Sequence, residues 1–260
     1  AIYHMRKFSI GVFLDILTEN KKEWIENLDF INSLEGVEHI EIFLEYIPST
    51  NAEINFFKDI AKKYKIIVHA PCLDLNLLSP NGEIVNATIS KLQKAYSFST
   101  ETHARVFTMH AGLMPKFWKE ELVIQKLKRA LKTIQMSKTL PVCIENMPER
   151  WSIQIPYPCT PTHYKNIARF SFLTMDIGHF LKSKTNPIPI LKRFSDKIQD
   201  IHLHDVYQGS DHSEIGGGIL DLRAFIDVLE EIKYDKFVTI EVVGRKEIRE
   251  SWKILQKNLV

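Results

Sequence analysis

Six acidic or imidazole side chains each follow a short apolar run, and these runs are spread along most of the chain. The six residues are His69 after KIIV, His110 after RVFTM, Glu145 after PVCI, Asp176 after FLTM, His202 after IQDI and Glu241 after FVTI. Carboxylates and imidazoles are common ligands of Mn²⁺, Zn²⁺, Fe²⁺ and Mg²⁺ in proteins. If the six groups met in one place, they would be costly to bury without a cation between them. The pattern therefore predicts a metalloenzyme.

Short β-rich runs alternate with amphipathic helical stretches along the whole chain. The β-rich runs cover residues 7–14, 38–44, 65–70, 105–110, 141–146, 171–176, 198–203 and 237–242. The clearest helical stretches cover 83–101, 117–137 and 220–232. Eight repeats of a strand followed by a helix are typical of the α/β class and predict a single (β/α)₈ TIM barrel. Active sites of such barrels lie at the C-terminal ends of the strands, which is where the six residues fall.

The sequence predicts one barrel domain over residues 5–260. Residues 1–4 have the character of an expression-tag remnant, with Met5 as the native start. Residues 147–160 contain several prolines and form the longest expected irregular loop. This loop either covers the substrate or is a plain surface excursion.

Composition narrows the class of protein. The chain has 260 residues, of which 45% are hydrophobic and 25% are charged, as is usual for a globular protein with a large core. A net charge of +2 is too small to require a nucleic-acid partner. No apolar run reaches the length of a membrane span, and no secretory signal opens the chain. Three cysteines without CxxC spacing fit a reducing compartment, so we expect a cytoplasmic protein.

Further polar residues accompany the predicted ligands. His204 follows His202 by two residues, and we expect it to fill a barrel position rather than to support a ligand. Asp205 is expected to orient a neighbouring ligand. The glycines at 216–218 form either a simple loop or a cradle whose backbone N–H groups bind a phosphate.

Two arginines follow strand-end glutamates in the sequence. Arg150 comes five residues after Glu145, and Arg245 comes four residues after Glu241. Either arginine is a candidate to bind a phosphate or carboxylate of the substrate, and a solvated surface role is the alternative.

Together these motifs resemble those of the xylose isomerase-like TIM-barrel superfamily. The motifs are Val-His-Ala-Pro at 68–71, Met-His-Ala-Gly at 109–112, Ile-Glu-Asn at 144–146, Asp-Ile-Gly-His at 176–179, His-Leu-His-Asp at 202–205 and Ile-Gly-Gly-Gly at 215–218. The resemblance runs from the first strand to the last helix. This superfamily includes isomerases and epimerases of sugars and sugar phosphates, and also apurinic endonucleases of the endonuclease IV type.

Similarity to the ketose epimerases implies one divalent metal ion, Mn²⁺, Zn²⁺ or Fe²⁺. The implied ligands are Glu145, Asp176, His202 and Glu241. Glu145 and Glu241 would also move a proton through a metal-stabilised enediolate, and His179 would contact a substrate oxygen. We expect His69, His110 and His212 to line the pocket or hold a second ion. The substrate would be a small sugar, sugar phosphate or polyol.

Similarity to the endonucleases implies instead three zinc ions and DNA as the partner. The matching ligands would be His69, His110, Glu145, Asp176, His179, His202, His212 and Glu241. A ninth ligand of that family falls on Ser210, with Asp211 adjacent. Glu45, in the loop after the second strand, would face the DNA backbone unfavourably, so we favour the isomerase. A third alternative is a noncatalytic barrel that binds a sugar or a protein.

Overall fold

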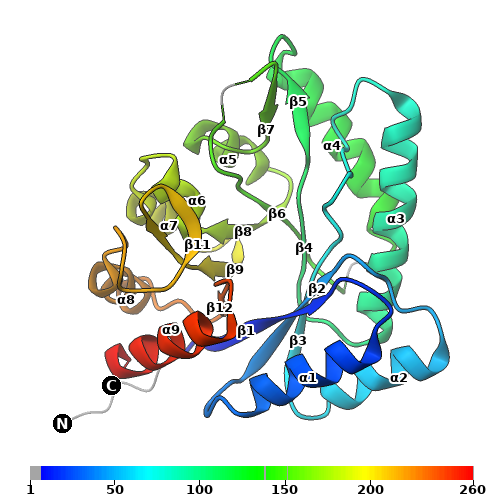
Figure 1. Ribbon diagram of the computed structural model, residues 1–260. Helices are drawn as coiled ribbons and strands as arrows, with labels where there is room; N and C mark the ends of the chain where they lie inside the picture. The colour runs from blue at the N-terminus through cyan, green and yellow to red at the C-terminus, as the bar shows by residue number, and fades with distance from the viewer. Residues whose placement is uncertain (1–6, 138, 151, 260) are drawn as a thin grey trace.

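Eight parallel strands close into a barrel in the computed structural model (Figure 1), which describes residues 7–137, 139–150 and 152–259. The strands are β1 (Ser9–Ile16), β2 (His39–Leu44), β3 (Lys65–His69), β4 (Phe107–Met109), β6 (Val142–Glu145), β8 (Phe172–Asp176), β9 (Ile198–Leu203) and β12 (Phe237–Ile240). Their order around the barrel is β1-β12-β9-β8-β6-β4-β3-β2. The predicted (β/α)₈ fold is confirmed, and every predicted strand lies within two residues of an observed one. The expected tag remnant at 1–4 lies outside the described residues.

Helices connect the strands and cover the outside of the barrel (Figure 1). They are α1 (Lys21–Asn32), α2 (Asn51–Ile60), α3 (Gly82–Glu101), α4 (Glu120–Ile134), α5 (Pro161–Ile167), α6 (Ile177–Lys182), α7 (Pro187–Phe194), α8 (Leu222–Glu231) and α9 (Arg245–Asn258). Leu127 and Ile134 of α4 belong to the same hydrophobic core as Ile144 of β6. Within the described part of the chain, no helix is both long and apolar enough to span a membrane.

Polar side chains occupy much of the barrel interior. His39 on β2 lies 2.9 Å (Nε2 to Oγ1) from Thr239 on β12, although these strands are not neighbours in the sheet. The contact therefore crosses the inside of the barrel. It passes Gly11 of β1, where a Cβ atom would overlap the His39 ring. Thr239 in turn donates a hydrogen bond to Asp200 of β9, two residues before His202.

Two short antiparallel ribbons accompany the barrel. In one ribbon, β5 (Leu113–Pro115) pairs with β7 (Gln154–Pro156). The expected irregular loop at 147–160 therefore contains a strand, which the sequence did not reveal because its partner lies about forty residues away. In the other ribbon, β10 (Asp205–Tyr207) pairs with β11 (Ser210–Ser213). This second ribbon redirects the chain immediately after β9, so His204 does not lie within that strand.

Candidate metal centre

The four residues predicted to hold one metal ion come together at one end of the barrel. Glu145 ends β6, Asp176 ends β8, His202 lies in β9 and Glu241 follows β12. These four strands are consecutive neighbours around the barrel, so their C-terminal ends lie side by side. One ligand atom from each residue lies within 4.8 Å of those of the other three. The structure therefore places the predicted set in one cluster.

The His202 imidazole indicates that this cluster suits a cation. Its Nε2 lies 3.1 Å from a carboxylate oxygen of Glu41, so we assign the ring proton to Nε2. When a metal ion is bound the ring would be neutral, and the other nitrogen, Nδ1, would carry a lone pair. It faces Glu145 Oε1 at 3.3 Å and Glu241 Oε2 at 3.1 Å, and it has no hydrogen-bond partner among the described residues. A lone pair set against carboxylate oxygens is the arrangement that a divalent cation stabilises.

The carboxylates and imidazoles of the cluster stabilise each other's charged forms. Burial alone would raise the pKa of Glu145, but His202 and His110 outweigh it and hold that pKa well below the usual range. Burial likewise opposes a charge on His202, yet the carboxylates of Glu41, Glu241 and Glu145 raise its pKa well above 6.5. In the absence of a metal ion, imidazolium groups therefore balance the carboxylates.

A second group lies on the other side of Glu145. The Nε2 atoms of His69 and His110 both lie 3.1 Å from Glu145 Oε2. His69 Nδ1 lies 2.8 Å from the carbonyl oxygen of Ala70, to which it donates, and this directs Nε2 to the carboxylate. A backbone carbonyl that fixes the tautomer in this way is common for histidines that bind metals. The structure thus brings His69 and His110, which were expected to line the pocket or hold a second ion, to the candidate metal centre.

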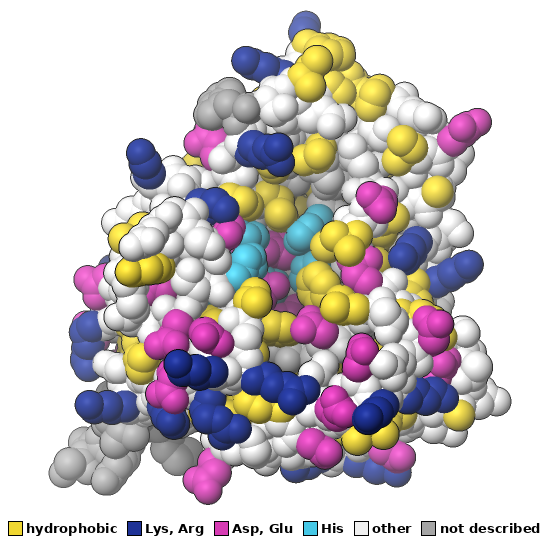
Figure 2. Space-filling model, in the orientation of Figure 1, with side chains coloured by type: hydrophobic (Ala, Val, Ile, Leu, Met, Phe, Trp, Pro, Cys, Tyr) yellow, Lys and Arg dark blue, Asp and Glu magenta, His cyan; other side chains and the backbone are white. Residues whose placement is uncertain are grey.

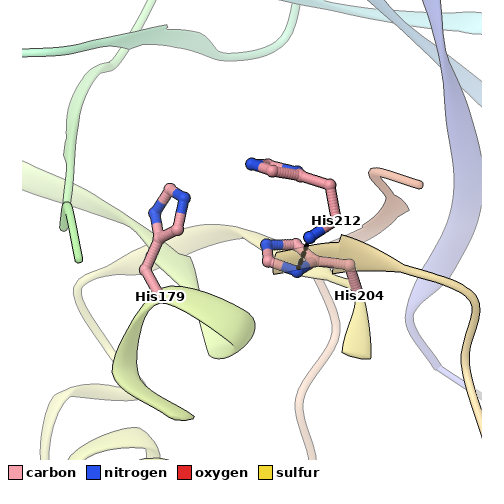
Figure 3. A group of neighbouring side chains, drawn as sticks. All are labelled: His179, His204 and His212. Carbon is pink, nitrogen blue, oxygen red and sulfur yellow. Dashed lines mark hydrogen bonds between the residues drawn. The ribbon is translucent and has the colours of Figure 1, made fainter. Parts of the chain in front are cut away.

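Three more histidines, His179, His204 and His212, lie together (Figure 3), and both His179 and His204 lie beside the Asp176 carboxylate. The rings of His204 and His212 stack with their centroids 4.1 Å apart. His204 accepts the His212 backbone N–H at Nδ1 (2.8 Å), so its Nε2–H donates to Asp176 Oδ2 (3.0 Å). Both nitrogens of His204 are therefore engaged. The expectation that His204 merely fills a barrel position is wrong, because the ring holds the carboxylate of a candidate ligand.

His179 and His212 keep one nitrogen each for other partners. His179 Nδ1 lies 2.8 Å from the carbonyl oxygen of Asn146, and His212 Nδ1 lies 3.0 Å from that of Glu241. If each donates its Nδ1–H there, Nε2 carries the lone pair. Both residues line the cavity above the metal centre, so these atoms can meet a substrate or an ion.

The glycine-rich loop binds an internal carboxylate, and this decides between the two alternatives for residues 216–218. The Asp205 carboxylate accepts hydrogen bonds of 2.8–3.0 Å from the backbone N–H groups of Val206, Gly216, Gly218 and Leu220. These amides already bind an internal anion, so the cradle reading is wrong for them. The same contacts correct the expectation for Asp205, which orders the loop and not a neighbouring ligand.

Two other expectations concern charged residues around the centre. Asp211 pairs with Lys182 Nζ at 2.9 Å, and Ser210 is exposed, so neither supplies the ninth ligand of the endonuclease set. Arg150 is exposed and Arg245 donates to Asn27 Oδ1 at 2.9 Å. Neither arginine is among the residues that line the metal cavity. Their predicted contact with a substrate phosphate in that cavity is not supported.

Three acidic residues lie in the site although they were not predicted from the sequence. Glu41 and Asp200 lie below His202, with oxygens 3.1 Å and 3.4 Å from its Nε2. Their signal was present, because each alternates with apolar residues and so shares the inward face of its strand. Asp15 lines the cavity from the end of β1, and burial together with Glu241 raises the pKa of Asp15 to about 6.

A cavity of about 290 Å³ opens above the metal centre. Figure 2 shows its histidine and acidic side chains gathered in a hollow of the surface. Its apolar wall consists of Phe13, Phe43, Met147 and Val243. Phe43 also stacks on His69, with the ring centroids 4.7 Å apart. The hollow has the size of a small-molecule site with convergent polar groups.

Comparison with known proteins agrees with this architecture. Residues 28–258 match the family model described as "Xylose isomerase-like TIM barrel". An uncharacterized protein of Methanocaldococcus jannaschii is 26% identical over 219 residues, which cover 79% of this chain and 74% of that protein.

Two solved structures share the fold at lower identity. One is a D-tagatose 3-epimerase-like protein, with a TM-score of 0.80, 24% identity and coverage of 96% of this chain and 97% of the other. The other is D-psicose 3-epimerase from Clostridium cellulolyticum H10 with D-tagatose. It has a TM-score of 0.74, 14% identity and coverage of 96% and 99%. At these identities the likeness establishes the fold alone.

Proposed function

Because the chain belongs to the xylose isomerase-like TIM-barrel family, we propose that it is a metal-dependent isomerase or epimerase of a small sugar, sugar phosphate or related polyol. The orphaned Nδ1 of His202, set between the carboxylates of Glu145 and Glu241, carries this proposal. The names of the two structural neighbours belong to the same class of reaction.

We place one divalent cation among Glu145, Asp176, His202 and Glu241. This mixed set of carboxylates and one imidazole suits Mn²⁺, Zn²⁺ or Fe²⁺. When bound, the cation would polarise the carbonyl group of the substrate and so acidify the neighbouring C–H bond. Asp176 is held for this role by His204 and by the backbone N–H of His179, which donates to Asp176 Oδ1.

Glu145 and Glu241 are the proposed proton acceptor and donor. Both line the cavity, and their strands β6 and β12 are separated by β8 and β9, so the two carboxylates reach a bound molecule from different sides. Burial disfavours their charge, but His202 outweighs it and lowers the pKa of both, so both carboxylates are ionised in the metal-free protein. One would remove the proton beside the carbonyl, and the other, as its carboxylic acid, would return a proton on the opposite face; exchange with solvent after product release would restore both groups.

The cavity favours an uncharged sugar. Among the described residues that line it, none is a lysine or an arginine, which are the usual partners of a phosphate group. His179 is placed to contact a substrate oxygen through Nε2. His69 and His110 are placed to bind a hydroxyl group or a second ion beside Glu145.

Deuterium exchange tests the proposal. The metal-loaded protein should incorporate deuterium from D₂O into a C–H position of at least one ketose in a panel that includes fructose, tagatose and psicose. Glu145→Gln should slow this exchange by about 10²–10⁴-fold, because it removes a positioned acid–base group. A matched control, Glu53→Gln on α2, should leave the exchange rate unchanged. If no ketose exchanges, or if Glu145→Gln exchanges at the wild-type rate, the proposal fails.

An endonuclease remains the second candidate because two further histidine groups flank the four-residue set. Elemental analysis of the purified protein separates the two functions. About one metal ion per chain supports the isomerase, whereas three zinc ions together with cleavage of an abasic-site oligonucleotide would support the endonuclease.

A further inference from the structure

A second cavity adjoins the metal cavity. It has a volume of about 330 Å³ and lies between the end of β1, helix α1 and the start of α9. Phe13, Asp15 and Val243 line both cavities, so the two spaces share a wall at these residues. The second cavity is slightly larger than the one above the metal centre. It therefore has room for a second chemical unit of similar size.

We propose that this second cavity is a subsite for an uncharged glycosyl unit attached to the sugar that reacts at the metal centre. The inference rests on the proposed isomerase or epimerase function and names its substrate class, a glycosylated ketose or a related glycoside.

The wall between the two cavities is held in place. The backbone N–H of Val243 donates to the carbonyl oxygen of His212 at 3.1 Å, which ties this wall to the metal centre. Val243 itself is 70% exposed, so its side chain stands at the open side of the junction. A substrate longer than one sugar can therefore extend from the metal cavity into the second cavity without moving a buried side chain.

Both hydrogen-bond acceptors and hydrogen-bond donors face this second cavity. The half-buried Asp15 carboxylate has no hydrogen bond or ion pair with any residue that the structure describes, so it can accept from hydroxyl groups. Asn27 uses Oδ1 to accept from Arg245 Nη2 at 2.9 Å, which leaves its amide N–H groups as donors. Arg245 lies with its guanidinium carbon 5.8 Å from the Phe30 ring centroid. Its other N–H groups are further donors.

The balance of charge selects among ligands. One carboxylate and one guanidinium line the subsite, so its lining carries no net charge that would favour an anionic or a cationic ligand. Hydroxyl groups can donate to Asp15 and accept from Asn27 or Arg245 at once. The aromatic rings of Phe13 and Phe30 supply apolar surface for the C–H faces of a sugar. A neutral, hydroxyl-rich unit is therefore the ligand that suits this lining.

Matched substrates test the subsite. The kcat/KM for deuterium exchange should be compared between fructose and three ketoses that carry a hexosyl unit on it, isomaltulose, leucrose and lactulose. At least one of these should exceed fructose by about tenfold or more, because contacts remote from the reacting carbon contribute to transition-state binding. Asn27→Trp, which fills the subsite, should lower this ratio of kcat/KM values about tenfold. Glu26→Trp is the control, since Glu26 precedes Asn27 on α1 but does not line the cavity.

The ratio is independent of overall activity, so a general loss of folding or metal cancels. If fructose exchanges but none of the glycosylated ketoses is better, or if Asn27→Trp leaves the ratio unchanged, the subsite is refuted while the proposed function stands. If no ketose exchanges at all, the proposed function fails, and saturation-transfer NMR with isomaltulose tests the subsite separately. A saturation-transfer signal from isomaltulose that is lost in Asn27→Trp and kept in Glu26→Trp supports the subsite. Absence of this signal in the wild type overturns the subsite.

Discussion

Replacement of Glu41 by Gln tests whether a carboxylate below the metal centre makes His202 a ligand. Glu41 is buried and lies 3.1 Å from His202 Nε2, so in the neutral ring the lone pair of Nδ1 faces the carboxylates that we propose as metal ligands. A glutamine amide can also donate a hydrogen bond, and it carries no charge to attract the ring proton. The imidazole would then lose both its fixed tautomer and part of its basicity.

The expected loss of metal affinity is about 10–100-fold, as is typical when the partner of a ligating histidine is removed. This corresponds to roughly 1.4–2.8 kcal/mol of binding free energy. We expect the same substitution to affect the stability of the metal-free protein in the opposite direction.

The opposite effect on stability follows from the pKa of Glu41. The pKa of Glu41 is raised from 4.5 to about 6. Burial and the nearby Asp200 raise it, and together they outweigh the opposing effect of His202. This rise is equivalent to about 2 kcal/mol. The contribution of Glu41 to stability is complete below pH 4.5 and is lost as the pH rises through 6. Glutamine does not titrate, so the stability of metal-free Glu41→Gln relative to wild type should increase as the pH rises from 4.5 through 6.

Two measurements check these opposite effects. Calorimetric titration with Mn²⁺ and Zn²⁺ at pH 7.5 gives the metal affinity of the wild type and of Glu41→Gln. Urea unfolding with a chelator at pH 4.5 and pH 7.5 gives the stability of the metal-free forms. Glu53→Gln is a control for a buried carboxylate away from the metal centre. An unchanged metal Kd in a folded Glu41→Gln protein would refute the role given to Glu41.

Three further predictions concern stability. Asp205→Asn should destabilise the protein by about 2 kcal/mol or more, because several backbone N–H groups lose a charged acceptor. An unchanged urea unfolding curve would contradict this prediction. Gly11→Ala should cost about 1–3 kcal/mol, because the new Cβ would overlap His39; thermal unfolding measures it, and an unchanged Tm argues against the packing described. The pKa of Glu53 is lowered to about 2, chiefly by the backbone N–H of Thr50. The stability difference between wild type and Glu53→Gln should therefore be present above pH 4.5 and vanish as the pH falls through 2. A pH-independent difference would be inconsistent with the hydrogen bond from the Thr50 backbone N–H to Glu53.

The barrel and the four-residue cluster were predictable because they depend on chain order more than on detailed packing. Parallel strands joined by helices must place their C-terminal ends at one edge, so residues such as Glu145 and Asp176 meet whatever their loops do. The alternation of His39 and Glu41 with apolar residues also marked a polar barrel interior, although only the closed barrel shows that these side chains touch β9 and β12.

The sequence by itself determined the repeat of strands and helices and the residue types at each strand end. The tertiary structure alone decided which partner each polar atom meets. His204 supports Asp176 because the chain turns into β10 just after β9, and Asp205 binds the glycine loop because that loop folds back over it. The physical reason is range: periodicity and strand order are local or topological properties, whereas a hydrogen bond depends on positions of about 3 Å precision between segments far apart in the chain.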